Sequence, residues 1–254
     1  MKTIVSLAAM LLAFTAPLAA QSKLPAPRVT GLKNPESVAV GPDGNIYISV
    51  IGEFDKDGDG GVMKVVDGKA VPFATGLDDP KGLTSWRKSL FVTDKNRIWR
   101  IDLKGKKEVF VPASAFPTPP LFLNDLVADA KGNLYVSDSG DLKGNGGAVY
   151  RIDSKGKVKL ITDSKQTPAL KVPNGLVMDS ETHLLMVDFL SGELLRIHIP
   201  DGATTKVAEG FDGGDGLAFD WYGRLYVSSW KNGTVHVIPR PGAKAVLVAS
   251  GFQS

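Results

Sequence analysis

The chain of 254 residues contains no cysteine, only three histidines and no large excess of charge of either sign. Without cysteine it can form no disulfide, no thiolate nucleophile, no zinc site built on thiolates and no iron–sulfur cluster. Thirty basic residues against 27 acidic ones leave a formal net charge of +3 at pH 7. This balance argues against nucleic acid as a partner, because nucleic-acid-binding proteins carry clustered positive charge.

The first 20 residues are predicted to be a secretory signal peptide. Lys2 precedes an apolar run from Ile4 to Phe14, and small residues follow up to Ala20, as is typical of such peptides. A membrane anchor is the alternative, but the run is shorter than the roughly 20 residues that a spanning helix needs. We therefore expect cleavage after Ala20, a periplasmic or secreted location, no membrane contact after cleavage, and one domain over residues 21–254.

A sequence unit of about 45 residues recurs five times. The aligned segments begin at residues 36, 81, 124, 174 and 215, so successive units lie 45, 43, 50 and 41 residues apart. Each unit contains four short segments in which apolar and polar residues alternate, with Gly, Asp and Asn at the turns. Four strands in 40–50 residues are typical of a β-propeller blade, whereas a β-sandwich does not require one register to recur five times. We therefore predict an all-β propeller of four-stranded blades.

The strand count predicts that a sixth blade is incomplete. PRVTG (27–31) matches the pattern of a fourth strand, yet no first three strands precede it. In propellers such an outer strand at one terminus commonly completes the blade that begins at the other terminus. The fifth unit already has its own fourth strand (245–251), and GFQS (251–254) stands where a sixth unit would begin. We expect five complete blades and a sixth that is truncated at the C-terminus.

One residue at the start of the first strand of each unit should face the propeller axis, all five at the same end of the channel. These axial residues are Glu36, Lys81, Asn124, Asn174 and Asp215. Four of them carry oxygen donors, which calcium prefers, whereas zinc and copper favour His or Cys. We predict that these four bind calcium, with zinc, manganese or magnesium as alternative divalent cations. The other interpretation is that they only hydrogen-bond the turns in which they lie.

Loops on the same face are expected to form a pocket over the ion. The connection 112–123 is rich in proline and carries Phe116, Leu121 and Phe122, which we expect to form an apolar rim. Phe122 is predicted to contact substrate.

Two charged residues are further candidates for the substrate pocket. Lys81 would orient a carboxylate or hydroxyl of the substrate, with a solvated lysine as the alternative. Asp138 ends a second strand and begins the long loop 139–147 on the same face.

A second calcium site is a weaker hypothesis. Asp55, Asp57, Asp59 and Gly60 match the start of a D-x-D-x-D-G calcium loop, but Val66 stands where a glutamate would close it. We favour a solvated acidic turn there.

Four motifs carry a family resemblance: PES (35–37), LND (123–125), VPNGL (172–176) and GDGL (214–217). At these residues the chain resembles the family of senescence marker protein 30, gluconolactonase and luciferin-regenerating enzyme, which are six-bladed propellers with a metal in the channel. The resemblance covers about residues 36–252. It implies that Glu36, Asn124, Asn174 and Asp215 bind the metal, and that Asp215 accepts a proton in lactone hydrolysis. The chain differs at Phe122, where sugar-lactone members of the family often carry Arg.

The expected function is therefore an exported, calcium-dependent hydrolase of the gluconolactonase type, acting as a monomer on a small lactone or ester. The ion would polarise the carbonyl and stabilise the oxyanion, and Asp215 would take a proton from the attacking water. The alternative is a noncatalytic propeller that binds a ligand or a partner protein, because a fold by itself does not define a function.

Overall fold

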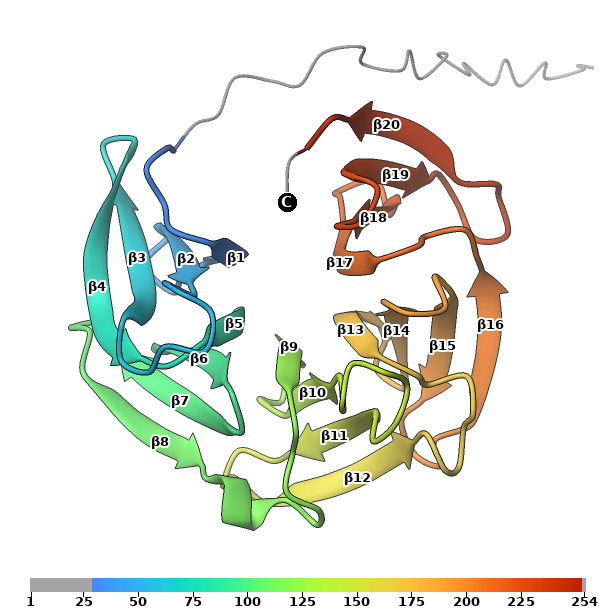
Figure 1. Ribbon diagram of the computed structural model, residues 1–254, viewed down its shortest axis with the longest axis horizontal. Coiled ribbons are helices and arrows are strands. Elements are labelled where there is room, and N and C mark those ends of the chain that lie inside the picture. The colour runs from blue at the N-terminus through green and yellow to red at the C-terminus, as the bar shows by residue number, and fades with distance from the viewer. Residues whose placement is uncertain (1–28, 253–254) are drawn as a thin grey trace, which may run out of the picture.

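A computed structural model describes residues 29–252, and the predicted signal peptide lies outside this range. Within it, twenty strands form five four-stranded antiparallel sheets, and the one short helical turn is 3-10 in type, at Ala113–Ala115. Figure 1 shows the sheets as blades around an axis, with the first strand of each innermost and the fourth at the rim. The predicted all-β propeller with five complete blades is confirmed. No helix in the described part of the chain is long and apolar enough to cross a membrane.

The strands of each blade follow one another in the chain and pair in that order. Blade one consists of β1 Pro35–Val40, β2 Ile46–Val50, β3 Gly60–Val66 and β4 Lys69–Leu77. Blade two consists of β5 Pro80–Trp86, β6 Ser89–Asp94, β7 Arg97–Asp102 and β8 Lys107–Val111. Blade three consists of β9 Leu123–Ala128, β10 Leu134–Asp138, β11 Ala148–Ile152 and β12 Val158–Asp163.

The last two blades repeat this arrangement. Blade four consists of β13 Pro173–Ser180, β14 His183–Asp188, β15 Leu194–His198 and β16 Thr204–Ala208. Blade five consists of β17 Gly214–Phe219, β18 Leu225–Ser229, β19 Thr234–Ile238 and β20 Val246–Ser250.

The turn between β9 and β10 illustrates why the hairpins form where the sequence predicts them. The Asp129 carboxylate accepts hydrogen bonds from the backbone N–H groups of Lys131 (2.9 Å) and Asn133 (2.8 Å). Gly132 adopts a φ of 84°, a left-handed conformation that costs glycine little. The aspartate and glycine that recur between strands thus fix both the position of the turn and the register of the strands beside it.

Apolar clusters between successive blades hold the ring together. The first, between blades one and two, surrounds Tyr47, and the next two surround Phe91 and Tyr135. The fourth, between blades four and five, contains Leu185 at the equivalent position of its second strand. All four side chains are buried, so the core consists of layers between the blades.

The ring is open between blade five and blade one, as Figure 1 shows. The first strands of consecutive blades lie against each other from β1 to β17, but β17 and β1 make no comparable contact. Because Ala39 and Tyr47 pair and face blade two, the neighbouring pair Val40 and Ile46 faces the open sector. The side chains of Val40 and Ile46 are 63% and 43% exposed. Apolar sheet surface therefore borders this sector.

The predicted sixth blade remains a prediction. Of the expected outer strand 27–31, the structure describes residues 29–31, and these form no strand. The remaining two residues lie outside the described range.

Candidate functional site

All five axial residues line one cavity of about 610 Å³ at the end of the channel where the first strands begin. Each is the second residue of the first strand of its blade, on β1, β5, β9, β13 and β17. A second cavity of about 560 Å³ lies among the first strands and is lined by the same residues except Lys81. The four oxygen-bearing residues therefore lie where the two cavities meet. The structure brings together every residue predicted as a metal ligand.

A β-bulge in each first strand directs these side chains. In blade three, Leu123 pairs with Asp138 and Leu126 with Val136, so Asn124 and Asp125 together stand opposite Ser137. The first strands of the other four blades show the same register shift at the axial residue. A bulge of this kind re-aims a side chain that regular alternation would point elsewhere. As a result, both Asn124 and Asp125 line the channel.

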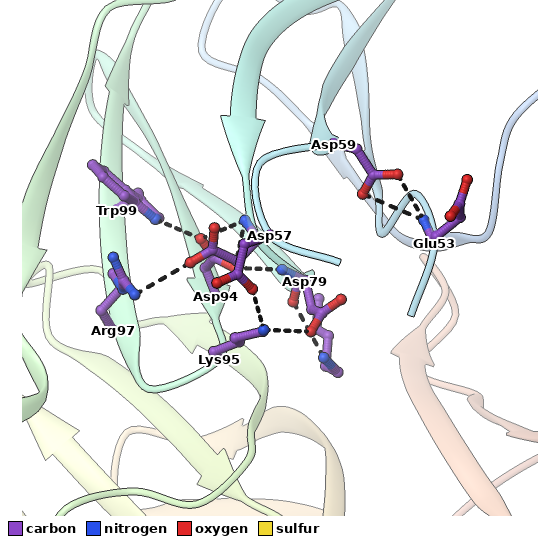
Figure 2. Close-up of polar contacts among 10 residues, drawn as sticks. Glu53, Asp57, Asp59, Asp79, Asp94, Lys95, Arg97 and Trp99 are labelled. Atoms are coloured by element: carbon purple, nitrogen blue, oxygen red, sulfur yellow. Dashed lines mark hydrogen bonds and ion pairs between the residues drawn. The ribbon is translucent and has the colours of Figure 1, made fainter. Parts of the chain in front are cut away.

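Buried aspartates hold the segments that lead to three of the axial residues. Asp94, Asp138 and Asp188 end the second strands of blades two, three and four. Each carboxylate accepts hydrogen bonds of 2.7 to 3.1 Å from two consecutive backbone N–H groups in the segment that enters the first strand of its own blade. In every case these two groups belong to the residues three and two positions before the axial residue. Figure 2 shows this arrangement in blade two, where Trp99 Nε1 also donates to Asp94 at 2.8 Å.

Hydroxyl groups then tie each of these first strands to the preceding blade. Ser49 Oγ donates to the backbone oxygen of Lys81 at 2.5 Å, and Thr93 Oγ1 donates to that of Asn124. Ser139 Oγ donates to the backbone oxygen of Pro173 at 2.7 Å, one residue before Asn174. The axial residues of blades two, three and four are therefore fixed from two blades, which preorganises this part of the site.

Asn124 provides the test of whether the residues present suit a cation. Its side chain is 6% exposed, and its Nδ2 donates to Ser139 Oγ at 3.2 Å. Its Oδ1 is buried without a hydrogen-bond partner in the described residues. An unpaired buried oxygen is costly, because it has lost its contacts with water. A cation bound among the axial oxygens would satisfy it, so the donor set fits a hard divalent ion such as calcium.

Without a cation, the charged forms of the carboxyl groups in the site are unfavourable. Burial raises the pKa of Glu36 well above its ordinary value, and the negative charges of Asp215 and Asp125 raise it further. Burial also raises the pKa of Asp215, against a lowering effect of its hydrogen bond with the Asn174 side chain. The pKa of Asp125 rises to about 7, chiefly through burial. A bound cation would favour the charged forms of all three.

No cluster of three or more His, Cys, Asp or Glu suited to a metal occurs in residues 29–252. A site at the axial residues therefore depends on the amide oxygens of the two asparagines.

Lys81 is buried rather than solvated. Its side chain lies in the cavity wall, and the residue is 4% exposed. Nζ donates to the backbone oxygen of Asp79 at 3.2 Å and lies 4.2 Å from the centroid of the Phe122 ring. Burial lowers the pKa of Lys81, while the negative charges of Asp79 and Glu36 act in the opposite direction. The solvated alternative for Lys81 is thus wrong.

The predicted apolar rim is correct for one residue and wrong for another. Phe122 lines the cavity, and Leu121 is 61% exposed beside it in the chain. Phe116 instead belongs to the core between blades two and three, where its ring lies 5.1 Å from that of Tyr150. The proline-rich connection has no periodicity that would have distinguished an inward from an outward phenylalanine.

Three aromatic residues of the cavity wall were not predicted. They are Phe54, Phe189 and Trp230, and the rings of the last two lie 6.0 Å apart. Phe189 and Trp230 each directly follow the second strand of their blade, the position that Ser139 occupies in blade three. Comparison of this position across the aligned repeats would have found them.

Asp138 does not line either cavity at the axial residues. It is 2% exposed, and it accepts hydrogen bonds from the backbone N–H groups of Leu121, Phe122 and Gly140. Its position supports a role in holding the loop that carries Phe122, and its predicted contact with substrate stays untested.

The acidic turn at residues 55–59 does not form a shared cation site. Asp57 pairs with Lys95, and Asp59 accepts a hydrogen bond from the backbone N–H of Glu53 at 3.1 Å. Figure 2 shows these two aspartates directed at different partners. The arrangement agrees with the acidic turn that the sequence favours.

The fold and the site define an all-β propeller whose axial cavity is lined by oxygen donors from four blades. The family model described as "SMP-30/Gluconolactonase/LRE-like region" matches residues 82–251. The chain belongs to this family, as the four motifs predicted.

Solved structures of low sequence identity share the fold. A gluconolactonase from Xanthomonas campestris has 21% identity and a TM-score of 0.69, and the match covers 87% of this chain and 78% of that one. A chain in a nidogen/laminin complex has 19% identity and a TM-score of 0.68, with 87% of this chain and 81% of that one covered. No curated protein sequence matches this chain.

Proposed function

We propose that this protein is an exported hydrolase that opens a small lactone at the axial cavity and depends on a divalent cation, calcium in the first instance. The observation that carries the proposal is the convergence of Glu36, Asn124, Asn174 and Asp215 on one cavity, with the buried Oδ1 of Asn124 left unpaired. Membership of the SMP-30/gluconolactonase/LRE-like family supports the lactone as substrate class. Export rests on residues 1–20 of the sequence alone.

Those four residues would hold the cation. When bound, the cation would supply a Lewis acid that polarises the carbonyl of the substrate.

Asp215 is the residue proposed to accept the proton of the attacking water. Asp215 lines the axial cavity, and a bound cation would keep its carboxylate in the charged form that accepts a proton. Asn174, from the neighbouring blade, lines the same cavity as Asp215. The oxygen of the water bonds to the carbonyl carbon, the ring C–O bond breaks, and the proton moves from Asp215 to the released oxygen. The product is the open hydroxy acid.

The walls of the cavity suit a small molecule with both polar and apolar parts. Phe122, Phe189 and Trp230 cover one part, and Lys81 supplies a buried positive charge. The Lys81 ammonium would attract the carboxylate that forms on ring opening. Because Phe122 lies directly against Lys81, it limits how far the ammonium moves.

A lactone panel that includes glucono-δ-lactone tests the proposal. Hydrolysis above the uncatalysed rate should occur with calcium, disappear with chelator, and fall at least a hundredfold in Asp215→Asn, with the circular dichroism spectrum retained. Thr204→Ala, which removes a hydroxyl that bonds the backbone oxygen of Gly202 away from both axial cavities, serves as control and should retain activity. If calcium binds but no lactone is hydrolysed, the hydrolase proposal fails and a noncatalytic binding module becomes the better account.

A further inference from the structure

One position of the second strand repeats through all five blades and is aromatic in four of them. Its residues are Tyr47, Phe91, Tyr135, Leu185 and Tyr226. In the first three blades the ring is buried in the apolar layer against the next blade. In blade four the same layer receives only the smaller side chain of Leu185. The aromatic ring of the second strand is therefore missing from the interface between blades four and five, where Phe211, from the segment before β17, is the buried aromatic residue of the cluster.

A cavity of about 460 Å³ lies at this interface and is lined by Leu185. The buried side chains of Leu194, Leu225 and Ile238 form its apolar wall, and Phe219, 39% exposed, lies on its border. It shares no lining residue with the two cavities at the axial residues. It is thus a separate apolar site of a size that accepts a small ligand.

Arginines give this cavity a positive charge. In the first three blades the aromatic residue of the second strand pairs with a cationic residue of the third strand. These cationic residues are Lys64, Arg100 and Arg151. In blade four this residue is Arg196, whose Nε lies 2.6 Å from Asp179 Oδ2. Arg240 also lines the cavity, and no acidic side chain within residues 29–252 forms an ion pair with it. Two arginines against one aspartate leave an excess positive charge beside the apolar wall.

We propose that this cavity binds a small aromatic carboxylate. The ring occupies the space that an aromatic side chain fills at the other blade interfaces and lies against Leu185 and Phe219. The carboxylate pairs with Arg240, whose guanidinium donates two parallel hydrogen bonds to such a group.

The probe for this site is 3-(4-hydroxyphenyl)propionate, titrated into the full chain by isothermal calorimetry without calcium. One molecule should bind per chain. Arg240→Gln, a change at an exposed residue, should weaken binding at least tenfold. The uncharged analogue 4-ethylphenol should bind more weakly than the carboxylate, and Arg240→Gln should leave its affinity unchanged.

Leu185→Phe tests the place of the ring. The introduced side chain should fill the cavity and abolish binding of both compounds, whereas Leu185→Met, which changes the residue without adding a ring, should retain binding. Asp215→Asn should have no effect, because Asp215 does not line this cavity. If Leu185→Phe does not fold, the comparison of Arg240→Gln with the wild-type chain still shows whether the carboxylate binds at this cavity.

Three results would overturn the proposal. The first is no binding of the carboxylate at millimolar concentration. The second is binding that Arg240→Gln leaves unchanged. The third is binding that Asp215→Asn removes, since the probe would then occupy the axial cavity.

Discussion

The ammonium of Lys81 lies 4.2 Å from the centroid of the Phe122 ring, although the two residues belong to different blades. Lys81 is on β5, and Phe122 directly precedes β9. The contact keeps a buried positive charge beside the oxygen donors of the axial cavity, where it lowers the pKa of Glu36. The same charge would oppose a bound cation while attracting an anionic product.

Lys81→Met should strengthen calcium binding. The substitution keeps the length of the side chain and removes a positive charge near Glu36. Removal of roughly 1 kcal/mol of repulsion corresponds to an affinity gain of about fivefold. Calorimetric titration with calcium measures this change in affinity. Lys64→Met, which removes a lysine paired with Asp43 at 2.8 Å, is the control. Weaker binding in Lys81→Met would mean that Lys81 supports the site instead.

Gly175→Ala should disrupt the site more than the equivalent change in blade five. A Cβ on Gly175 would lie 2.2 Å from the backbone oxygen of Asp215, so the first strands of blades four and five would have to separate. We expect a loss of about 1–3 kcal/mol in the free energy of unfolding, together with weaker calcium binding.

Gly216→Ala is the matched control for this change. Gly216 has the same place on β17, which contacts no other first strand than β13 to a comparable extent within residues 29–252, and its Cβ would meet only Ser228 Oγ at 3.1 Å. Urea unfolding and calcium titration compare the two variants. Equal losses in both would contradict the close approach of the two strands.

The stability of the metal-free protein should fall as pH rises from 4 to 8. Asp125 has a pKa of about 7 in the folded protein, against 3.8 ordinarily. Between these values the folded state binds the proton more tightly than the unfolded state, so deprotonation at higher pH favours unfolding. For one buried carboxyl the effect is at most a few kcal/mol.

Asp125→Asn isolates this contribution, because asparagine does not titrate. Thermal unfolding midpoints of both proteins, measured with chelator at several pH values, should show a smaller fall for the variant. Its absolute stability should be lower at acidic pH, since one of the hydrogen bonds from Leu126 (2.8 Å) and Leu176 (2.7 Å) loses its acceptor. Parallel curves for the two proteins would contradict the raised pKa.

The blades and the axial residues could be predicted because the five repeats of the chain can be aligned with one another. A register that recurs five times identifies equivalent positions, and Glu36, Asn124, Asn174 and Asp215 needed only that alignment. Asp125 was missed because simple alternation turns it away from its neighbour Asn124, whereas the bulge lets both line the channel.

Contacts between blades were harder to predict. The burial of Lys81 depends on Phe122, which lies about 40 residues further along the chain in a loop without periodicity. The same absence of a pattern hid the inward position of Phe116. Such features depend on how blades meet, which a local sequence pattern does not encode.

The claim that the axial residues form a cation site is tested most directly by titrating the purified chain with calcium in an isothermal calorimeter. The account predicts one ion per chain, with affinity reduced at least tenfold in Glu36→Gln, in Asn124→Leu and in Asp215→Asn, while each variant keeps its β-sheet spectrum. Absence of calcium binding by the wild-type chain, or binding that all three substitutions leave unchanged, would contradict it.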